Sequence, residues 1–258
     1  MSGENAYHNK GDLYDGEEYV GNIYLSSQRA GNDSAPLQIL RTCYLWLTYS
    51  DDNGQTWSNP VNVSGQVKES WMKFCGTGPG FGIELKNGEH AGRLVFPIYY
   101  TNNSGFQSSA CIYSDDNGVT WERGISPNDA RGEDMGDSQN PEFSQQLTES
   151  QIIELNSGNL LQFMRNTGGN GKVAVSRSTD GGETWSAPIN TDATEVYCQL
   201  SVLHFGVTEN GKDRVIMSNP GGSGRNNGTL RICEVTETED SFSVQWTESK
   251  MFAPGNYA

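Results

Sequence analysis

The sequence predicts an all-β fold built from repeated antiparallel sheets. A phrase of the form Ser-x-Asp-x-Gly-x-Thr-Trp occurs three times, and the serines that open the copies are 64 residues apart, a period typical of stacked supersecondary units. Each copy follows a short apolar run of the kind that forms a half-buried strand. Glycine accounts for 31 of the 258 residues, and helical heptads are absent from the sequence. The copies are Ser50–Trp57, Ser114–Trp121 and Ser178–Trp185.

Each copy of the phrase is suited to a tight hairpin turn. Its Asp carboxylate can accept backbone N–H groups, its Gly can adopt a positive φ, and its Ser and Thr hydroxyls can close the loop. The Trp is expected to begin the next strand and to bury its ring between neighbouring sheets. We therefore interpret the Asp residues of the copies as parts of the scaffold.

The other elements follow from similar patterns along the chain. Residues 1–24 are rich in Gly, Asn and charged residues and are predicted to be the end of an inserted segment. An Asn-Ser-Gly turn between two apolar runs predicts a hairpin. The predicted strands before the three copies are 43–49, 110–113 and 173–176, and the predicted hairpins without a copy are 148–165 and 229–246.

The repeated phrase resembles the Asp-box, or bacterial neuraminidase repeat (BNR), which lies at a hairpin of propeller blades. A repeat of 64 residues has room for one four-stranded blade, and 258 residues correspond to about four blades. The resemblance therefore implies that residues 25–258 form a partial six-bladed β-propeller of the sialidase type, here about four blades.

Composition limits the partners that we expect. The formal net charge of −15 argues against nucleic acid and anionic membrane surfaces. No run approaches the roughly 20 apolar residues that span a bilayer, so no membrane insertion is expected. The cysteines are odd in number, lack metal-site spacing and are interpreted as buried apolar residues; they are Cys43, Cys75, Cys111, Cys198 and Cys233. We predict no metal and no cofactor.

Glu149 and Arg165 are the first candidate site residues. Glu149 begins the first strand of the hairpin 148–165 and Arg165 ends the second, so both are expected at the same end. Spacing alone favours a structural ion pair. The stretch is similar, however, to bacterial exo-sialidases, in which such a Glu assists a tyrosine nucleophile and an Arg sixteen residues later binds the sialic acid carboxylate. The resemblance implies these roles for Glu149 and Arg165, while Glu154 is interpreted as structural.

Arg225 is the second candidate. It lies in the glycine-dense stretch Met217–Gly228, which leaves an apolar strand, and such a loop can hold an arginine over a pocket. Without the resemblance, a solvent-exposed loop with an incidental arginine is an equal reading. In the sialidases a similar Ser-Asn-x-Gly-Gly loop carries an arginine of the carboxylate-binding triad, which implies that role for Arg225.

Tyr99 and Gln107 form a softer match to the same family. Adjacent tyrosines in a strand place one ring on each face, so Tyr99 and Tyr100 are expected to point in opposite directions. Residues spaced like Tyr99 and Gln107 line the sugar pocket of the sialidases. A place in the core is an equal alternative for the ring of Tyr99 and for that of Tyr100. The glycines of Gly76–Ile83 are interpreted as a tight crossing near the pocket.

Other parts of the sialidase pattern have no match in the sequence. Nothing before Ser50 resembles the family's first triad arginine or its acid/base Asp. Its nucleophilic tyrosine follows an aromatic-Ala pair, so the end of the chain predicts that tyrosine at position 259, with Tyr257 as the weaker candidate. The chain by itself is therefore expected to be inactive.

The resemblance implies an exo-α-sialidase that hydrolyses terminal sialic acids with retention. The expected partners are sialylated glycans or glycoproteins, and the expected location of the intact protein is extracellular or at the cell surface. Two alternatives remain open. One is a non-catalytic Asp-box propeller that binds glycans or proteins, and the other is a trans-sialidase.

Overall fold

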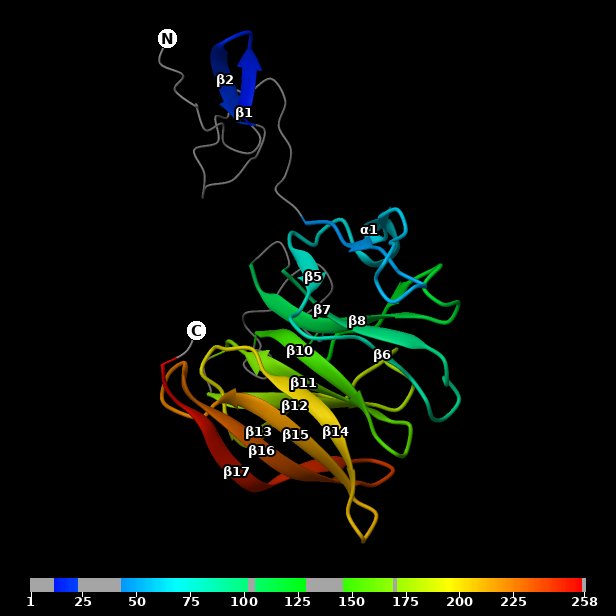
Figure 1. Ribbon diagram of the computed structural model, residues 1–258, viewed down its shortest axis with the longest axis vertical. Coiled ribbons are helices and arrows are strands. Elements are labelled where there is room, and N and C mark those ends of the chain that lie inside the picture. Colours follow the sequence, from blue (N-terminus) through cyan, green and yellow to red (C-terminus); the bar gives the residue numbers. More distant parts are fainter. Residues whose placement is uncertain (1–11, 23–42, 102–104, 129–145, 169–170, 257–258) are drawn as a thin grey trace. The chain divides into compact units, whose positions relative to one another are not determined.

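The computed structural model describes residues 12–22, 43–101, 105–128, 146–168 and 171–256 (Figure 1). The chain divides into two units, residues 1–43 and 44–258. In the first unit, β1 (Asp12–Asp15) and β2 (Glu18–Asn22) form an antiparallel hairpin. The predicted boundary between residues 24 and 25 lies outside the described residues and stays a prediction.

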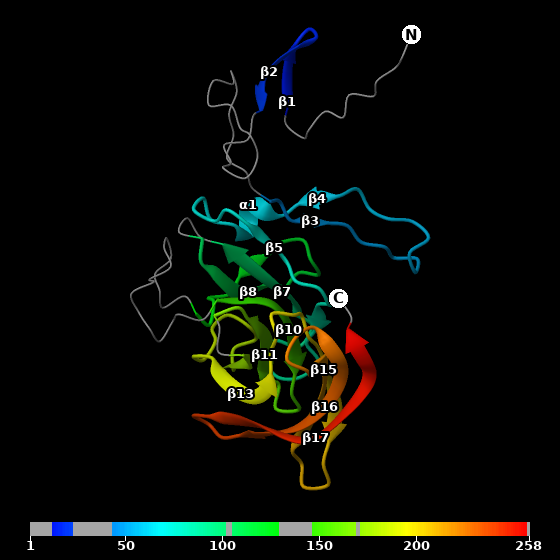
Figure 2. The same ribbon diagram turned by 90° about the vertical axis from the view of Figure 1, so that its left-hand side faces the viewer.

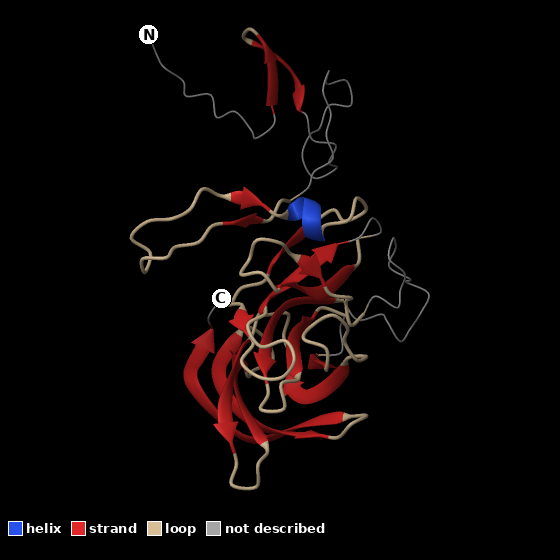
Figure 3. Ribbon diagram, turned by 90° about the vertical axis from the view of Figure 1, so that its right-hand side faces the viewer, coloured by secondary structure: helices blue, strands red, loops and turns tan. Residues whose placement is uncertain are grey.

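The described part of the second unit contains four antiparallel sheets and one short helix, α1 (Ser64–Val67), which confirms the all-β prediction (Figure 3). The first sheet consists of β3 (Trp46–Leu47) and β4 (Val61–Asn62). The second consists of β5 (Cys75–Thr77), β6 (Ile83–Glu84), β7 (Leu94–Thr101), β8 (Gln107–Ser114) and β9 (Glu122–Arg123).

The last two sheets are four-stranded, and in each the strands pair in chain order. One consists of β10 (Leu147–Glu154), β11 (Leu160–Asn166), β12 (Lys172–Ser178) and β13 (Ile189–Thr194). The other consists of β14 (Ser201–Val207), β15 (Asp213–Pro220), β16 (Asn226–Glu237) and β17 (Phe242–Asn256). Figure 2 shows β15, β16 and β17 running side by side, and their pairing confirms the predicted last hairpin.

The three Asp-boxes form the predicted turns with closely matching hydrogen bonds. In the second box, Ser114 Oγ accepts the Gly118 N–H at 2.8 Å, and Asp116 Oδ1 accepts the Thr120 N–H at 2.8 Å. The Thr120 hydroxyl donates to the other carboxylate oxygen at 2.6 Å. The same bonds recur in the first and third boxes. The aspartates therefore organise turns, as the sequence predicts.

The first box departs from the prediction in two respects. Only Trp46–Leu47 of the expected strand 43–49 is a strand, and the Trp57 ring is 63% exposed. Trp121 of the second box is 4% exposed and packs edge-on against Phe96, with ring centroids 5.6 Å apart. The physical reason is that Trp57 lies in the turn beyond the short pair β3–β4 and takes no part in the cluster in which Leu45 and Leu47 pack against the sheet β5–β9.

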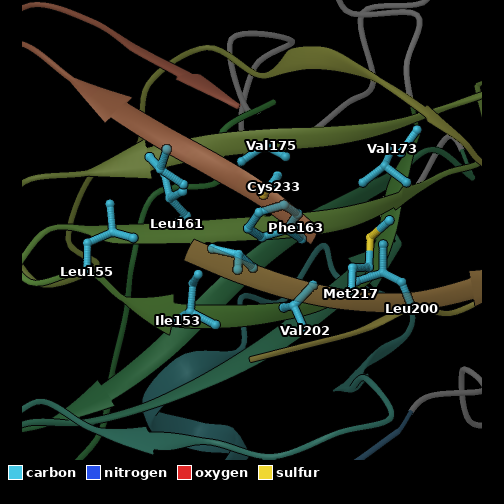
Figure 4. Close-up of a cluster of buried hydrophobic side chains, with 13 residues drawn as sticks. Ile153, Leu155, Leu161, Phe163, Val173, Val175, Leu200, Val202, Met217 and Cys233 are labelled. Carbon is cyan, nitrogen blue, oxygen red and sulfur yellow. The ribbon is translucent and has the colours of Figure 1, made fainter. Parts of the chain in front are cut away.

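The sheet β10–β13 is buried on both faces. On one face, Ile152 and Leu160 pack with Val95 and Tyr113 of the preceding sheet. On the other, Phe163 and further apolar residues of this sheet pack against β14–β17, as Figure 4 shows. This second cluster includes Ile153, Leu155, Leu161, Val173, Val175, Leu200, Val202, Met217 and Cys233. Alternating side chains thus connect three sheets through one central sheet.

Four of the five cysteines are buried, which agrees with their interpretation as apolar residues, and the fifth, Cys43, is half-buried. The described residues include no helix that is long and apolar enough to cross a membrane.

Candidate active site

The structure brings Glu149 and Arg165 into direct contact. Glu149 lies near the start of β10 and Arg165 near the end of β11, and Glu149 Oε2 accepts a bond from Arg165 Nη1 at 2.6 Å. The two side chains are only 23% and 21% exposed. The pairing of β10 with β11 shifts between Leu147 and Ser150, and an irregularity of this kind re-aims a side chain. The predicted placement at one end of the hairpin is therefore confirmed.

Neighbouring sheets hold β10 on both sides of Glu149. Ser109 Oγ of β8 donates a short bond to the Thr148 carbonyl. Gln151 Oε1 accepts the Val202 N–H of β14 at 2.7 Å. Buried hydrogen bonds between sheets fix the position of the strand that carries the carboxylate.

The glycines that follow β5 cross directly over this strand. A Cβ at Gly78 would lie 3.4 Å from the Glu149 Cα and 3.3 Å from the Ser150 N. A Cβ at Gly80, whose φ is +125°, would lie 2.0 Å from Gln151 Nε2. Only glycine permits so close an approach at a positive φ. The predicted tight crossing is confirmed, and it lies against Glu149.

Arg225 lies one sheet away, in the loop between β15 and β16. The loop closes through a bond from the Gly221 N–H to the Asn227 carbonyl at 2.9 Å. The Arg225 side chain is exposed, and its Nη2 donates to the Tyr197 carbonyl at 2.7 Å. Arg225 is thus held against the segment that connects β13 to β14, and its role in binding a carboxylate remains a prediction.

This connecting segment contains a residue that the sequence patterns did not single out, Glu195. It is 3% exposed, and its Oε1 accepts the Cys198 N–H at 2.7 Å. Burial raises the pKa of the Glu195 carboxyl, while the Cys198 N–H and the charge of Arg165 act in the opposite direction. Glu195 belongs to no motif of the sequence, so the sequence did not mark it as a candidate site residue.

Tyr99 and Gln107 lie on the preceding sheet. Tyr99 pairs with Gly76 of β5 and with Ser109 of β8, and its ring lies 4.8 Å from that of Phe74. Tyr100 points the other way and is 1% exposed in the core, so the expected opposition of the two rings is confirmed. Gln107 donates its N–H to Gln146 Oε1 at 3.3 Å, just before β10. Tyr257 lies outside the described residues.

The hollows of the surface do not by themselves identify a site. One of 290 Å³ lies at the first Asp-box, between Tyr49 and Ser58, and its walls are turn residues. A smaller one of 130 Å³ lies beside the segment that contacts Arg225, and its lining includes Cys198, Asn219 and Phe252. We place the candidate site at Glu149 and Arg165 because a half-buried acid–arginine pair can bind and polarise an anionic ligand. The described residues contain no group of three or more His, Cys, Asp or Glu side chains positioned to hold a metal ion.

Comparison with known proteins identifies the family. The sequence profile of the BNR repeat-like domain matches residues 23–256. The chain belongs to the BNR repeat-like domain family. Within this BNR repeat chain, the profile covers every candidate residue except Tyr257.

The BNR repeat chain is similar to sialidases. It is 36% identical over 218 residues to an anhydrosialidase of Macrobdella decora, which is 81% of this chain and 26% of that protein. It is 33% identical over 215 residues to a sialidase of Bacteroides fragilis, which is 81% of this chain and 36% of that protein. The chain thus spans about a third or less of the length of these curated relatives.

A solved structure supports the same relationship at the level of the fold. The intramolecular trans-sialidase of Ruminococcus gnavus, in complex with oseltamivir carboxylate, superposes with a TM-score of 0.68 and 30% identity, over 94% of this chain and 48% of that one. The predicted propeller-like sialidase fold is therefore confirmed, while the number of blades in the whole propeller stays a prediction.

Proposed function

We propose that the protein containing this chain is an exo-α-sialidase that cleaves terminal α-linked sialic acids with retention. The observation that carries this proposal is the 2.6 Å contact between Glu149 and Arg165 under the glycine crossing. The similarity of this chain to sialidases over 81% of its length supports the choice of substrate. Because the chain covers only part of those relatives, the activity belongs to the intact protein.

The two arginines are proposed to bind the substrate carboxylate. A guanidinium presents parallel N–H groups to a carboxylate and keeps its charge when it is partly desolvated. Arg165 would supply the donors close to Glu149, and Arg225 would supply donors from the neighbouring sheet. Tyr99 and Gln107, on the sheet before β10, are proposed to line the pocket for the rest of the sugar.

Glu149 is proposed to act on a tyrosine nucleophile. The anomeric carbon of sialic acid carries a carboxylate, which would repel a charged Asp or Glu nucleophile, and sialidases use tyrosine instead. Glu149 would take the phenol proton as the bond between the tyrosine oxygen and the anomeric carbon forms, while the family's acid/base Asp would protonate the departing glycosidic oxygen. Water would then attack the anomeric carbon, giving its proton to that Asp, as Glu149 returns the phenol proton to the departing tyrosine oxygen.

The proposed substrates are sialylated glycans, including those of glycoproteins. Such glycans are presented at cell surfaces and on secreted proteins, so the proposed location of the intact protein is extracellular or at the cell surface.

A second candidate function is intramolecular transfer, in which a hydroxyl of the bound sugar replaces water. The observation in its favour is the similarity to proteins named anhydrosialidase and intramolecular trans-sialidase. Product analysis separates the two: hydrolysis releases free sialic acid, and intramolecular transfer releases an anhydro sugar. Both use the same arginines and the same glutamate.

The test is Arg165→Lys and Arg225→Lys in the natural full-length protein, assayed with a fluorogenic sialoside. Lysine keeps the charge but loses the bidentate fork, so we expect KM to rise by about 10- to 100-fold with a smaller change in kcat. Arg214→Lys is the control, because Arg214 stacks on Phe205 within the sheet β14–β17, with 5.2 Å between guanidinium carbon and ring centroid.

An unchanged KM in both arginine variants would remove them from the binding site. A wild-type protein that binds sialyllactose without turnover would instead be the non-catalytic propeller.

A further inference from the structure

Glu195 is a buried carboxylate, and one of its two oxygens has no direct hydrogen-bond partner among the described residues. It follows β13 and is 3% exposed, and its backbone N–H donates to the Gly171 carbonyl at 2.9 Å. Oε1 accepts the Cys198 N–H at 2.7 Å, whereas Oε2 is buried and has no hydrogen-bond partner among the described residues. Burying an unsatisfied oxygen destabilises the fold, and more so when the group is charged, so its retention calls for an explanation.

Arg165 shows the complementary feature. Its Nη1 binds Glu149, but its Nε is buried and lacks a hydrogen-bond partner among the described residues. Arg165 lies close enough to Glu195 for its charge to lower the pKa of that carboxyl, against the effect of burial. Two neighbouring side chains of opposite charge therefore each carry a buried polar atom that has no hydrogen-bond partner among the described residues.

The segment that Glu195 closes also carries the contact to Arg225. The bond from the Cys198 N–H to Glu195 spans Val196 and Tyr197, and Tyr197 has a φ of +56°, in the left-handed region that a tyrosine rarely adopts. The surrounding structure must hold such a conformation. In this conformation the Tyr197 carbonyl accepts the bond from Arg225 Nη2 at 2.7 Å.

We propose that Glu195 is a positioning residue that orients both arginines of the anion site. The charge on its Oε2 orients the Arg165 guanidinium, and its Oε1 holds the turn whose Tyr197 carbonyl fixes Arg225. Glu195 itself touches no substrate. Its effect on catalysis rests on the proposed sialidase function, but the orientation of the arginines does not.

The deciding variant is Glu195→Gln in the natural full-length protein. Glutamine keeps an oxygen for the Cys198 N–H, so the turn persists, but it replaces the anionic Oε2 with a neutral NH₂ group and removes the negative charge near Arg165. We expect the Nε–H NMR resonance of Arg165, in protein labelled with ¹⁵N-arginine and assigned through Arg165→Lys, to move. We also expect KM for a fluorogenic sialoside to rise about 5- to 20-fold, with kcat changed less than about twofold.

Glu154→Gln is the matched control. Glu154 also accepts backbone N–H bonds, from Lys86 at 2.8 Å and Asn87 at 2.7 Å, but it lies at the far end of β10 from Glu149. Its substitution is expected to leave both the resonance and KM unchanged. A purely structural Glu195 would make the two variants alike.

An unmoved Arg165 resonance together with an unchanged KM in Glu195→Gln overturns the proposal. Should that variant fail to fold, Glu195→Asp decides by the same two measurements, because the shorter carboxylate keeps its charge but retreats from Arg165. A resonance shift in Glu195→Gln, together with a wild-type protein that turns over no sialoside, would support the role of Glu195 while refuting the proposed function.

Discussion

At Glu149, an irregular strand pairing turns a carboxylate out of the regular alternation of β10 and toward Arg165. Glu154, five residues later on the same strand, accepts two backbone N–H groups of the segment after β6 instead. Two glutamates of one strand thus have different tasks. The difference arises from their neighbours, since Glu154 has backbone N–H groups to accept and Glu149 has the Arg165 guanidinium beside it.

The Asp-box aspartates make a prediction about acid sensitivity. The Thr120 hydroxyl and then the Thr120 N–H lower the pKa of Asp116 to about 2. Because this pKa is depressed in the folded state, the carboxylate stabilises the fold above about pH 4, and its contribution is lost as the pH falls toward 2. Asp116→Asn is therefore expected to lower Tm at pH 7, with the difference from wild type narrowing between pH 4 and pH 2.

Calorimetric melting between pH 2 and pH 7 measures this difference. Asp240→Asn is the control, since Asp240 is exposed in the turn between β16 and β17. Melting temperatures of Asp116→Asn and wild type that differ by the same amount at every pH would contradict the assigned role.

The sequence predicted the contact between Glu149 and Arg165 but missed Glu195. The first contact follows from local geometry, because a short turn brings the two ends of a hairpin together. Glu195 is buried by residues that are distant in the sequence and pack around the end of β13, so no local sequence pattern predicts its burial. Arg225 was predicted as a loop residue, whereas its bond to the Tyr197 carbonyl depends on two segments 28 residues apart.

At the scale of the elements, the glycine crossing after β5 brings the backbone of the sheet β5–β9 against the strand that carries Glu149. Its backbone lies against Glu149 and Ser150 at Gly78 and against the Gln151 side chain at Gly80. Gln151 cannot retreat easily, because it is 2% exposed and accepts the Val202 N–H.

Gly80→Ala is therefore expected to destabilise the protein by about 2–4 kcal/mol and to reduce sialoside turnover, because strain at a positive φ adds to a collision with Gln151. The free energy of unfolding is measured by urea titration, with tryptophan fluorescence as the signal. Gly206→Ala separates the two contributions: Gly206 has a similar φ of +102°, but a Cβ there would meet nothing within 4 Å. Equal losses in both variants would show that the crossing itself contributes nothing.

Element boundaries were predictable where a sheet is complete. The hairpin β10–β11 matches the predicted span, since alternating residues there meet a sheet on at least one face. The last hairpin β16–β17 turns where predicted, but its second strand continues to Asn256, past the predicted end at residue 246. The expected strand 43–49 shrinks to Trp46–Leu47, because apolar alternation produces a strand only where a partner is available to pair with it.

In the unit of residues 44–258, Arg93 joins two successive sheets. It is 4% exposed, and its Nε and Nη2 donate to the two oxygens of Asp115 in the second Asp-box, each at 2.8 Å. It also reaches the third box, where Nη2 donates to Glu183 at 3.1 Å and Nη1 to the Gly181 carbonyl at 3.2 Å. One guanidinium therefore connects two Asp-box turns of neighbouring sheets.

Arg93→Ala should weaken the protein as a whole rather than one turn. Removing the guanidinium leaves the Gly181 carbonyl buried without its donor and the two carboxylates without their shared partner. We expect the free energy of unfolding to fall by about 2–4 kcal/mol. The partial exposure of Asp115 and Glu183 keeps this loss below the upper range for buried pairs. Because the lost bonds join two sheets, the urea transition should also broaden as the sheets unfold less cooperatively.

Arg214→Ala removes an arginine whose ring contact stays within one sheet, and it is expected to preserve the steepness of the transition. A transition for Arg93→Ala as steep as that of wild type, with a loss confined to a few tenths of a kcal/mol, would mean that apolar packing alone joins the sheets.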